Sequence, residues 1–303
     1  MTTDFIIIGG GPSGCAAALF AARAKRKAII IHKGTTPLIH TFQWLLPGFP
    51  NNLGPAEWLQ NLRSQIESYG FSILEEEVTQ AALGASVKQI TTTSGKTLEA
   101  PVIILATGCY DRQGLIEGEA KFVGHGVFYD AFQDAALCEG KEVLVEGKNE
   151  AAIRSVIYLS RFAKKIIFVV PAMRLEGDDH LLNLLRNNTK VEVLLSASIK
   201  NIEGDGQLKD ATVLCAGEEK KIETGAVFLF ARQSKPKYDF LKGTIEISEE
   251  GCVVVDEQLM TSVPGVFACG DMLAGVPQFP FVSAAQGLVA AMNADRYFSN
   301  TNP

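Results

Sequence analysis

A glycine-rich segment near the N-terminus constrains the fold more than any other feature of this sequence. Gly9-Gly10-Gly11-Pro12-Ser13-Gly14 fits the pattern GxGxxG and stands between an apolar run at 5–8 and an alanine-rich stretch at 15–26. In this pattern the first glycine makes a tight turn, the second lets the backbone approach a pyrophosphate, and the third lets the helix pack closely on the strand. The segment therefore predicts a dinucleotide site at a helix N-terminus, whose free N–H groups favour phosphate. A glycine-rich turn without a ligand is the alternative.

The apolar runs predict an α/β fold with two Rossmann-like domains, each of three layers. The first βαβ unit is expected at 5–31, with buried parallel strands at 5–8 and 28–31. A second is expected at 142–170, where a strand at 142–145, a helix at 151–162 and a strand at 165–170 follow one another. Two more strands, at 102–105 and 263–271, are expected to end in the small residues of Ala106-Thr107-Gly108 and Gly270-Asp271, and a helix at 283–296 follows. Ligands of such sheets lie across the carboxyl ends of the strands.

Composition excludes several classes of protein. The chain has 303 residues, of which 47% are hydrophobic and 20% charged, so disordered and fibrous structures are excluded. The net charge is -6 and the basic residues are scattered, which argues against nucleic acid as a partner. No apolar run approaches the roughly 18 residues of a membrane span, and the start lacks the order of a signal peptide. We therefore expect a cytoplasmic protein without a membrane span.

Six scattered cysteines include no CxxC pair and no cluster with histidine that could hold zinc, so no metal site is predicted. We interpret them as reduced and mostly buried thiols. Where an acidic residue normally binds the ribose, after the second strand, this chain has His32-Lys33. Lys33 either meets a phosphate or is solvated.

Beyond the first loop, several segments carry a specific resemblance over about residues 5–298. They are Ile7-Ile8-Gly9-Gly10-Gly11-Pro12-Ser13-Gly14, Pro47-Gly48-Phe49-Pro50, Ala106-Thr107-Gly108, Val253-Val254-Val255-Asp256-Glu257 and 261–271, which ends in Ala268-Cys269-Gly270-Asp271. The chain resembles the low-molecular-weight thioredoxin reductase family of FAD-dependent pyridine nucleotide-disulfide oxidoreductases.

The resemblance implies a homodimer in which each chain has an FAD domain, 1–112 with 243–303, and an inserted NAD(P)-binding-like domain at 113–242. It also implies an FAD site with Asp271 beside the ribityl chain and pyrophosphate, and Trp44 either stacked on the flavin or packed in the core. The implied FAD contacts are Gly9, Gly11, Pro12, Ser13, Gly14, His32, Lys33, Gln43, Trp44, Val78, Ala106, Thr107, Gly108, Gly270, Asp271, Gln278 and Phe279.

The inserted domain departs from the family wherever chemistry is expected. Asp130 and Gln133 occupy the positions of the redox cysteines, and neither side chain can exchange a disulfide. In the second glycine motif, Asn149 replaces a glycine and Glu150 places a carboxylate where the pyrophosphate would lie. The basic cluster for the NADPH 2′-phosphate aligns with Pro171-Ala172-Met173, and the turn over the nicotinamide side reads Ala231-Arg232-Gln233. In these losses the chain is similar to ferredoxin-dependent flavin thioredoxin reductases and diflavin-linked disulfide oxidoreductases.

The sequence therefore favours an FAD-dependent oxidoreductase that uses neither NADPH nor a CxxC disulfide. Its electron partner would be ferredoxin, flavodoxin, a thiol protein or a second flavin in the former NADPH site. The alternatives are a non-catalytic flavin-binding regulatory or structural dimer and a ferredoxin-NADP reductase of this fold. No catalytic residue is assigned; the candidates are Cys15, Cys109, Cys269 and His125.

Overall fold

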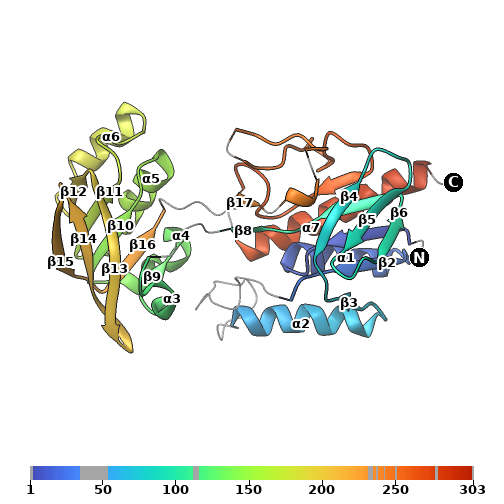
Figure 1. Cartoon of the computed structure of the whole chain (residues 1–303), viewed down its shortest axis with the longest axis horizontal. Coiled ribbons are helices and arrows are strands. Elements are labelled where there is room, and N and C mark those ends of the chain that lie inside the picture. The colour runs from blue at the N-terminus through green and yellow to red at the C-terminus, as the bar shows by residue number, and fades with distance from the viewer. Residues whose placement is uncertain are drawn as a thin grey trace. The chain divides into compact units, whose positions relative to one another are not determined.

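The computed structural model describes residues 3–34, 54–111, 116–230, 235–236, 238–241, 243–249, 251–276 and 279–301. It divides into two compact units, coloured in Figure 1 by residue number. In the described ranges, the first unit holds residues 3–34, 55–111 and those from 235 onward, and the second holds 54 and 116–230. Each unit is a separate α/β structure.

A parallel five-stranded sheet forms the centre of the first unit. Its strand order is β18-β7-β1-β2-β3, with β1 at Phe5–Ile8, β2 at Ala28–Ile31, β3 at Ile73–Leu74, β7 at Val102–Leu105 and β18 at Val266–Ala268. In register, Phe5 of β1 lies between Ala28 of β2 and Val102 of β7. Every residue of β1 and β7 is buried, as expected of parallel strands covered on both faces.

Alternate residues of these strands pack into two hydrophobic layers. Phe5 and Ile7 face α1 (Pro12–Arg23), α2 (Pro55–Ser68) and α7 (Pro280–Thr301) in one core cluster. Ile6 and Ile8 face the other side, where a three-stranded antiparallel sheet covers them. That sheet consists of β4 (Val78–Ala82), β5 (Lys88–Thr92) and β6 (Thr97–Ala100). The unit is therefore a three-layer sandwich. Its two hydrophobic layers arise because successive side chains of a strand point to opposite faces of the sheet.

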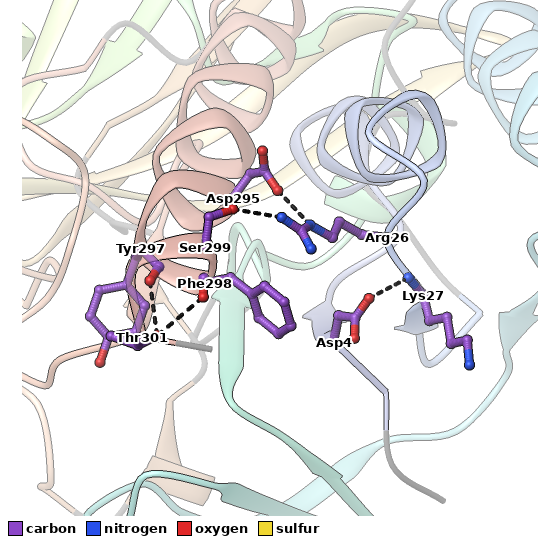
Figure 2. A network of polar contacts seen from close by, with 8 residues as sticks. All are labelled: Asp4, Arg26, Lys27, Asp295, Tyr297, Phe298, Ser299 and Thr301. Atoms are coloured by element: carbon purple, nitrogen blue, oxygen red, sulfur yellow. Dashed lines mark hydrogen bonds and ion pairs between the residues drawn. The ribbon is translucent and has the colours of Figure 1, made fainter. Parts of the chain in front are cut away.

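Polar contacts tie the C-terminal helix to the end of α1 (Figure 2). Arg26, which follows α1, pairs with Asp295 of α7 at 2.5 Å and donates from Nη2 to the Ser299 hydroxyl at 2.7 Å. Its guanidinium also lies 4.5 Å from the centre of the Phe298 ring. Segments from the early and late parts of the sequence thus pack together in the first unit. Helix α7 lies with α1 and α2 in the helical layer on one face of the parallel sheet.

The second unit repeats this plan around another parallel sheet, with strand order β12-β11-β10-β16-β9. Its bounds are β9 Val127–Phe128, β10 Glu142–Glu146, β11 Lys165–Val170, β12 Val191–Leu195 and β16 Ala226–Leu229. One face packs on α4 (Ala131–Asp134), η2 (Ala135–Cys138), α5 (Glu150–Leu159) and α6 (Asp179–Arg186). The other packs on β13 (Ala197–Asp205) and β14 (Gln207–Cys215), which form an antiparallel sheet with β15 (Glu218–Glu223). The short helix α3 (Glu119–Phe122) completes this face.

The α/β fold with two Rossmann-like units is confirmed, with small shifts in element bounds. The first helix begins at Pro12 rather than at residue 15, because proline is well suited to the first turn, where its missing N–H costs nothing. The last helix extends from Pro280 to Thr301, beyond the predicted 283–296. Among the described residues, no helix is long and apolar enough to cross a membrane.

Further short elements of the first unit lie between β7 and β18 in the chain. Strand β8 (Cys109–Asp111) pairs antiparallel with β17 (Lys235–Pro236), with Cys109 opposite Pro236. The 3-10 helix η3 (Asp239–Leu241) then contributes Phe240 and Leu241 to the core that includes Ile6 and Ile8. This return of the chain places η3 beside the carboxyl end of the parallel sheet.

Candidate functional site

The first glycine loop opens onto a cavity of about 310 Å³ at the carboxyl ends of β1, β2 and β7. Of the residues predicted from the sequence, Gly9, Gly11, His32, Lys33, Val78, Ala106 and Thr107 line it. A cavity at this end of a parallel sheet, bounded by a helix N-terminus, is the usual place for a dinucleotide phosphate group. The structure therefore brings these residues together, and their contact with FAD stays a prediction.

Two glycines of the loop are required by close backbone approaches. Gly9 has φ of 121°, and a Cβ there would collide with the carbonyl oxygen of Ala106. A Cβ on Gly14 would collide with the carbonyl oxygen of Gly9, since α1 starts directly against the loop. The GxGxxG pattern is therefore used here for turn geometry and for helix-to-strand contact, as the motif requires.

The Gly270-Asp271 segment lies beside the start of α1. Gly270 has φ of 80° and donates its N–H to the side chain of Gln286 at 2.8 Å. Asp271 accepts a hydrogen bond from the Ser283 hydroxyl at 2.6 Å. A Cβ on Gly270 would lie 2.8 Å from the hydroxyl of Ser13, so this segment and the first loop are adjacent. Pro12, Ser13, Gly14, Gly108, Gly270, Asp271 and Phe279 do not line the cavity itself.

His32 is buried at the end of β2 and accepts the Gly10 N–H on Nδ1 at 3.3 Å. Burial, together with the positive charges of Arg63 and Lys33, lowers the pKa of His32 to about 4. The imidazole is therefore neutral at physiological pH and carries its proton on Nε2. The exposed Lys33 lies 3.8 Å from Glu77, so its charge is partly balanced within the cavity wall.

Sequence reasoning missed several residues of the cavity wall. Glu76, Glu77 and Thr79 flank the predicted Val78, and Asp239 and Phe240 come from the return segment η3. The pair Glu76-Glu77 stands directly before Val78 and could have been found as acids next to a predicted contact. Nothing local marks Asp239 and Phe240, because their place depends on the long-range return of the chain.

Two of the three cysteine candidates lie in unreactive surroundings. Cys15 and Cys269 are fully buried in the core under α1, and burial raises the pKa of each thiol to about 12. Such thiols carry almost no thiolate at neutral pH, and thiolate is the reactive form. Cys109 is half-buried on β8, and His125 is exposed in a turn of the second unit. The described residues contain no group of three or more metal-ligating side chains.

At the second glycine loop, polar side chains cap the helix and pair with one another. Asn149 caps α5 by accepting the Ala152 N–H at 3.1 Å. Glu150, at the first position of α5, pairs with Arg154 at 2.6 Å. Lys148 pairs with Glu176 at 3.4 Å. The helix N-terminus, which would otherwise face a phosphate, is thus capped by an amide and flanked by carboxylates.

Asp130 and Gln133, which the resemblance places at the positions of the redox cysteines, stand at the start of α4. Asp130 caps this helix by accepting the N–H groups of Phe132 and Gln133 at 2.8 and 3.3 Å. Asp134, which the sequence analysis did not single out, is buried four residues later. Burial, reinforced by the charge of Asp130, raises the pKa of Asp134 to about 7. This carboxyl group exchanges its proton near neutral pH.

Some predicted residues lie outside the described ranges. They are Gln43, Trp44, Gln278, the segment Pro47-Gly48-Phe49-Pro50 and the turn Ala231-Arg232-Gln233.

With these features in view, the fold and the first loop define an α/β flavoprotein-type oxidoreductase. The profile of the pyridine nucleotide-disulphide oxidoreductase family matches residues 3–287, and the chain belongs to this family. A thioredoxin reductase of Aquifex aeolicus is 35% identical over 98% of this chain and 93% of its own length. Thioredoxin reductase from Giardia duodenalis superposes with a TM-score of 0.91 at 27% identity, covering 98% of this chain and 99% of that one. The enzyme from Streptococcus pyogenes superposes with the same TM-score at 26% identity, with 99% of both chains covered.

Proposed function

We propose that this chain is an FAD-dependent oxidoreductase that exchanges electrons with a partner other than NADPH and does so without a CxxC disulfide. The relatives are named thioredoxin reductases, so the proposal assigns to this chain the flavin oxidoreductase chemistry of its relatives. The contrast between the two glycine loops carries the proposal. The first opens onto a cavity, whereas the second leads into a helix whose N-terminus is capped by Asn149 and whose first turn carries the carboxylate of Glu150.

The first loop supports FAD as the bound nucleotide. The family binds FAD, and the residues present suit a pyrophosphate because the loop joins a buried strand to a helix N-terminus without a carboxylate in its first turn. When bound, FAD would supply the redox chemistry. The protein would bind its phosphates at Gly9 to Gly14 and orient the rest of the cofactor along the Ala106 and Asp271 segments.

The second loop supports the absence of NADPH. A phosphate at α5 would have to displace the Asn149 cap and approach the carboxylate of Glu150. Like charges at such a distance repel, and the 2′-phosphate would meet Pro171-Ala172-Met173 rather than a basic cluster. Disulfide exchange at α4 is also unsupported, since Asp130 and Gln133 hydrogen-bond to each other at 2.9 Å and carry no sulfur.

The electron partner is then a protein such as ferredoxin, flavodoxin or a thiol protein, or a second flavin bound to the second unit. The first class is favoured, because the phosphates of a further dinucleotide would meet the Asn149 cap and the carboxylate of Glu150 at the second loop. A flavin-binding dimer without turnover is the alternative, and a ferredoxin-NADP reductase would need the missing NADPH contacts.

We further propose that the protein is a homodimer through α7. Phe281, Leu288 and Met292 are 51%, 44% and 38% exposed, and their spacing places them on one face of this helix. Large apolar side chains gathered on an exposed helix mark an interaction surface. A second copy of the chain is the occupant that the family resemblance implies.

The proposal is tested by flavin content and by reduction. The purified protein, reconstituted with FAD, is expected to hold one flavin per chain and to bleach anaerobically on addition of reduced ferredoxin or flavodoxin. A content of two flavins per chain would indicate that the second flavin, and not a protein, is the electron partner. Bleaching by dithionite alone would favour the dimer without turnover.

A further inference from the structure

The peptide group on each side of Gly10 is held by a side chain from another element. On one side, the Gly10 N–H is donated to Nδ1 of His32, at the end of β2. On the other, the Gly10 carbonyl oxygen accepts from Nη2 of Arg63 on α2 at 3.2 Å and from Sγ of Cys15 at 3.5 Å. The middle residue of the glycine loop is therefore clamped in one orientation by groups of the same unit.

Because of peptide geometry, the contacts to the Gly10 carbonyl also fix the direction of the Gly11 N–H, at the edge of the cavity. The Gly10 carbonyl and the Gly11 N–H belong to one peptide, which is trans because the described backbone contains no cis bond. In a trans peptide these two groups point in opposite directions. Since the carbonyl faces Arg63 and Cys15, the Gly11 N–H faces away from them, and Gly11 lines the cavity. The Arg63 contact thereby presents an N–H donor to the phosphate site.

Without these hydrogen bonds the peptide plane between Gly10 and Gly11 would be free to flip. Glycine lies on both sides of it, and glycine has access to backbone conformations that other residues avoid. A flip would exchange the N–H donor for a carbonyl oxygen, which repels phosphate. Lysine is a poor replacement for Arg63, since a guanidinium holds an acceptor through a rigid fork of donors.

The clamp contributes little to stability. Nε of Arg63 is buried without a hydrogen-bond partner among the described residues. A buried donor left unpaired costs stability, and apolar replacements of buried charges are often neutral. The expected effect of removing Arg63 is thus on the loop rather than on folding.

We propose that Arg63 is a positioning residue for the cofactor, which acts through the Gly10 carbonyl to hold the Gly11 N–H toward the pyrophosphate. The inference rests on the proposed FAD site of the first unit. Arg63 itself does not line the cavity, so it touches the loop and not the ligand.

The test compares FAD affinity in deflavinated wild type, Arg63→Met, Arg63→Gln, Arg63→Lys and Arg23→Met. Arg23 is exposed at the end of α1, away from the loop. Arg23→Met therefore serves as the control, because it removes the same positive charge without touching the loop. Flavin fluorescence titration is expected to give a Kd at least about tenfold weaker for the Met and Gln variants, a smaller loss for Lys and no change for Arg23→Met. Thermal unfolding of the apo proteins is expected to shift little.

A second readout reports the loop without flavin. In the apo protein labelled with ¹⁵N-glycine, the Gly11 amide signal is expected to move in Arg63→Met and to stay in place in Arg23→Met. If Arg63→Met does not fold, Arg63→Gln takes its place. An Arg63→Met or Arg63→Gln protein that folds and binds FAD within twofold of wild type overturns the inference and leaves the proposed function standing. A wild-type chain that binds no FAD overturns both.

Discussion

The side-chain amide of Gln133 donates a hydrogen bond to the carboxylate of Asp130 at 2.9 Å. Both residues stand at the start of α4, where Asp130 also caps the helix. A capping carboxylate satisfies backbone N–H groups that would otherwise lack partners. Where the resemblance would place the redox cysteines, the structure therefore has a helix cap.

Replacing these two residues with cysteines tests whether α4 retains the geometry of a dithiol. We expect Asp130→Cys with Gln133→Cys to form an intramolecular disulfide on mild oxidation, because the two side chains already touch. Loss of the cap would cost about 1 kcal/mol of stability. Thiol titration before and after oxidation measures the bond, with Asp130→Cys alone as the control. The same double variant is expected to stay oxidised in the presence of NADPH, and its reduction by NADPH would contradict our account of the second loop.

Asp134 makes stability depend on pH. Its pKa is raised from 3.8 to about 7 in the folded chain, so between these values the native state holds a proton that the unfolded state has lost. Stability from this group is therefore present below about pH 4 and lost as the pH rises through 7.

We expect Asp134→Asn to remove this dependence and to raise the free energy of unfolding at pH 8 by about 4 kcal/mol. Urea unfolding at pH 5 and pH 8 checks it. The exposed Asp179→Asn in the same unit serves as the control. Equal gains at both pH values would show that Asp134 does not titrate in this range.

The sequence located strands such as 5–8 and 102–105 closely, because buried apolar runs are local signals. It did not predict β3, β9, β12 and β16 of the same parallel sheets. It also found the first loop, since GxGxxG combines a strand, a turn and a helix within a few residues. It missed Arg63, Asp239 and Phe240, which reach the site from segments far apart in the chain. The buried Asp134 was missed for a related reason, because burial of a carboxyl group is set by packing and not by its neighbours in sequence.

The cysteine candidates illustrate another limit. A thiol at a helix N-terminus, such as Cys15, is expected to have a lowered pKa. In the structure, burial outweighs both the helix and the nearby Arg63, and the pKa is raised to about 12. Sequence gives the position of a residue on a helix but not the desolvation of its side chain.

Arg26 links the two ends of the first unit, and its loss is expected to loosen α7. Arg26→Ala removes the partly buried ion pair with Asp295, the hydrogen bond to Ser299 and the stacking on Phe298. We expect the free energy of unfolding to fall by about 1 to 2 kcal/mol. Thermal unfolding measures the loss, with Arg23→Ala as the control, and equal melting temperatures for the two variants would contradict the proposed role.

The exposed face of α7 gives a prediction about assembly. Leu288→Glu with Met292→Glu is expected to convert the proposed dimer to a monomer, because charges would be placed in an apolar interface. Sedimentation velocity gives the state directly. Asn300→Glu, exposed on the same helix, is expected to remain dimeric. A dimer that survives the double substitution would place the interface elsewhere.

The most direct test of the central claim is an anaerobic titration of the FAD-loaded protein with NADPH and then NADH, followed by flavin absorbance. We predict no bleaching with either nucleotide and full bleaching with dithionite, because the second loop is capped by Asn149 and bears the carboxylate of Glu150. Rapid, stoichiometric bleaching by NADPH would contradict this account and make the protein a pyridine nucleotide reductase.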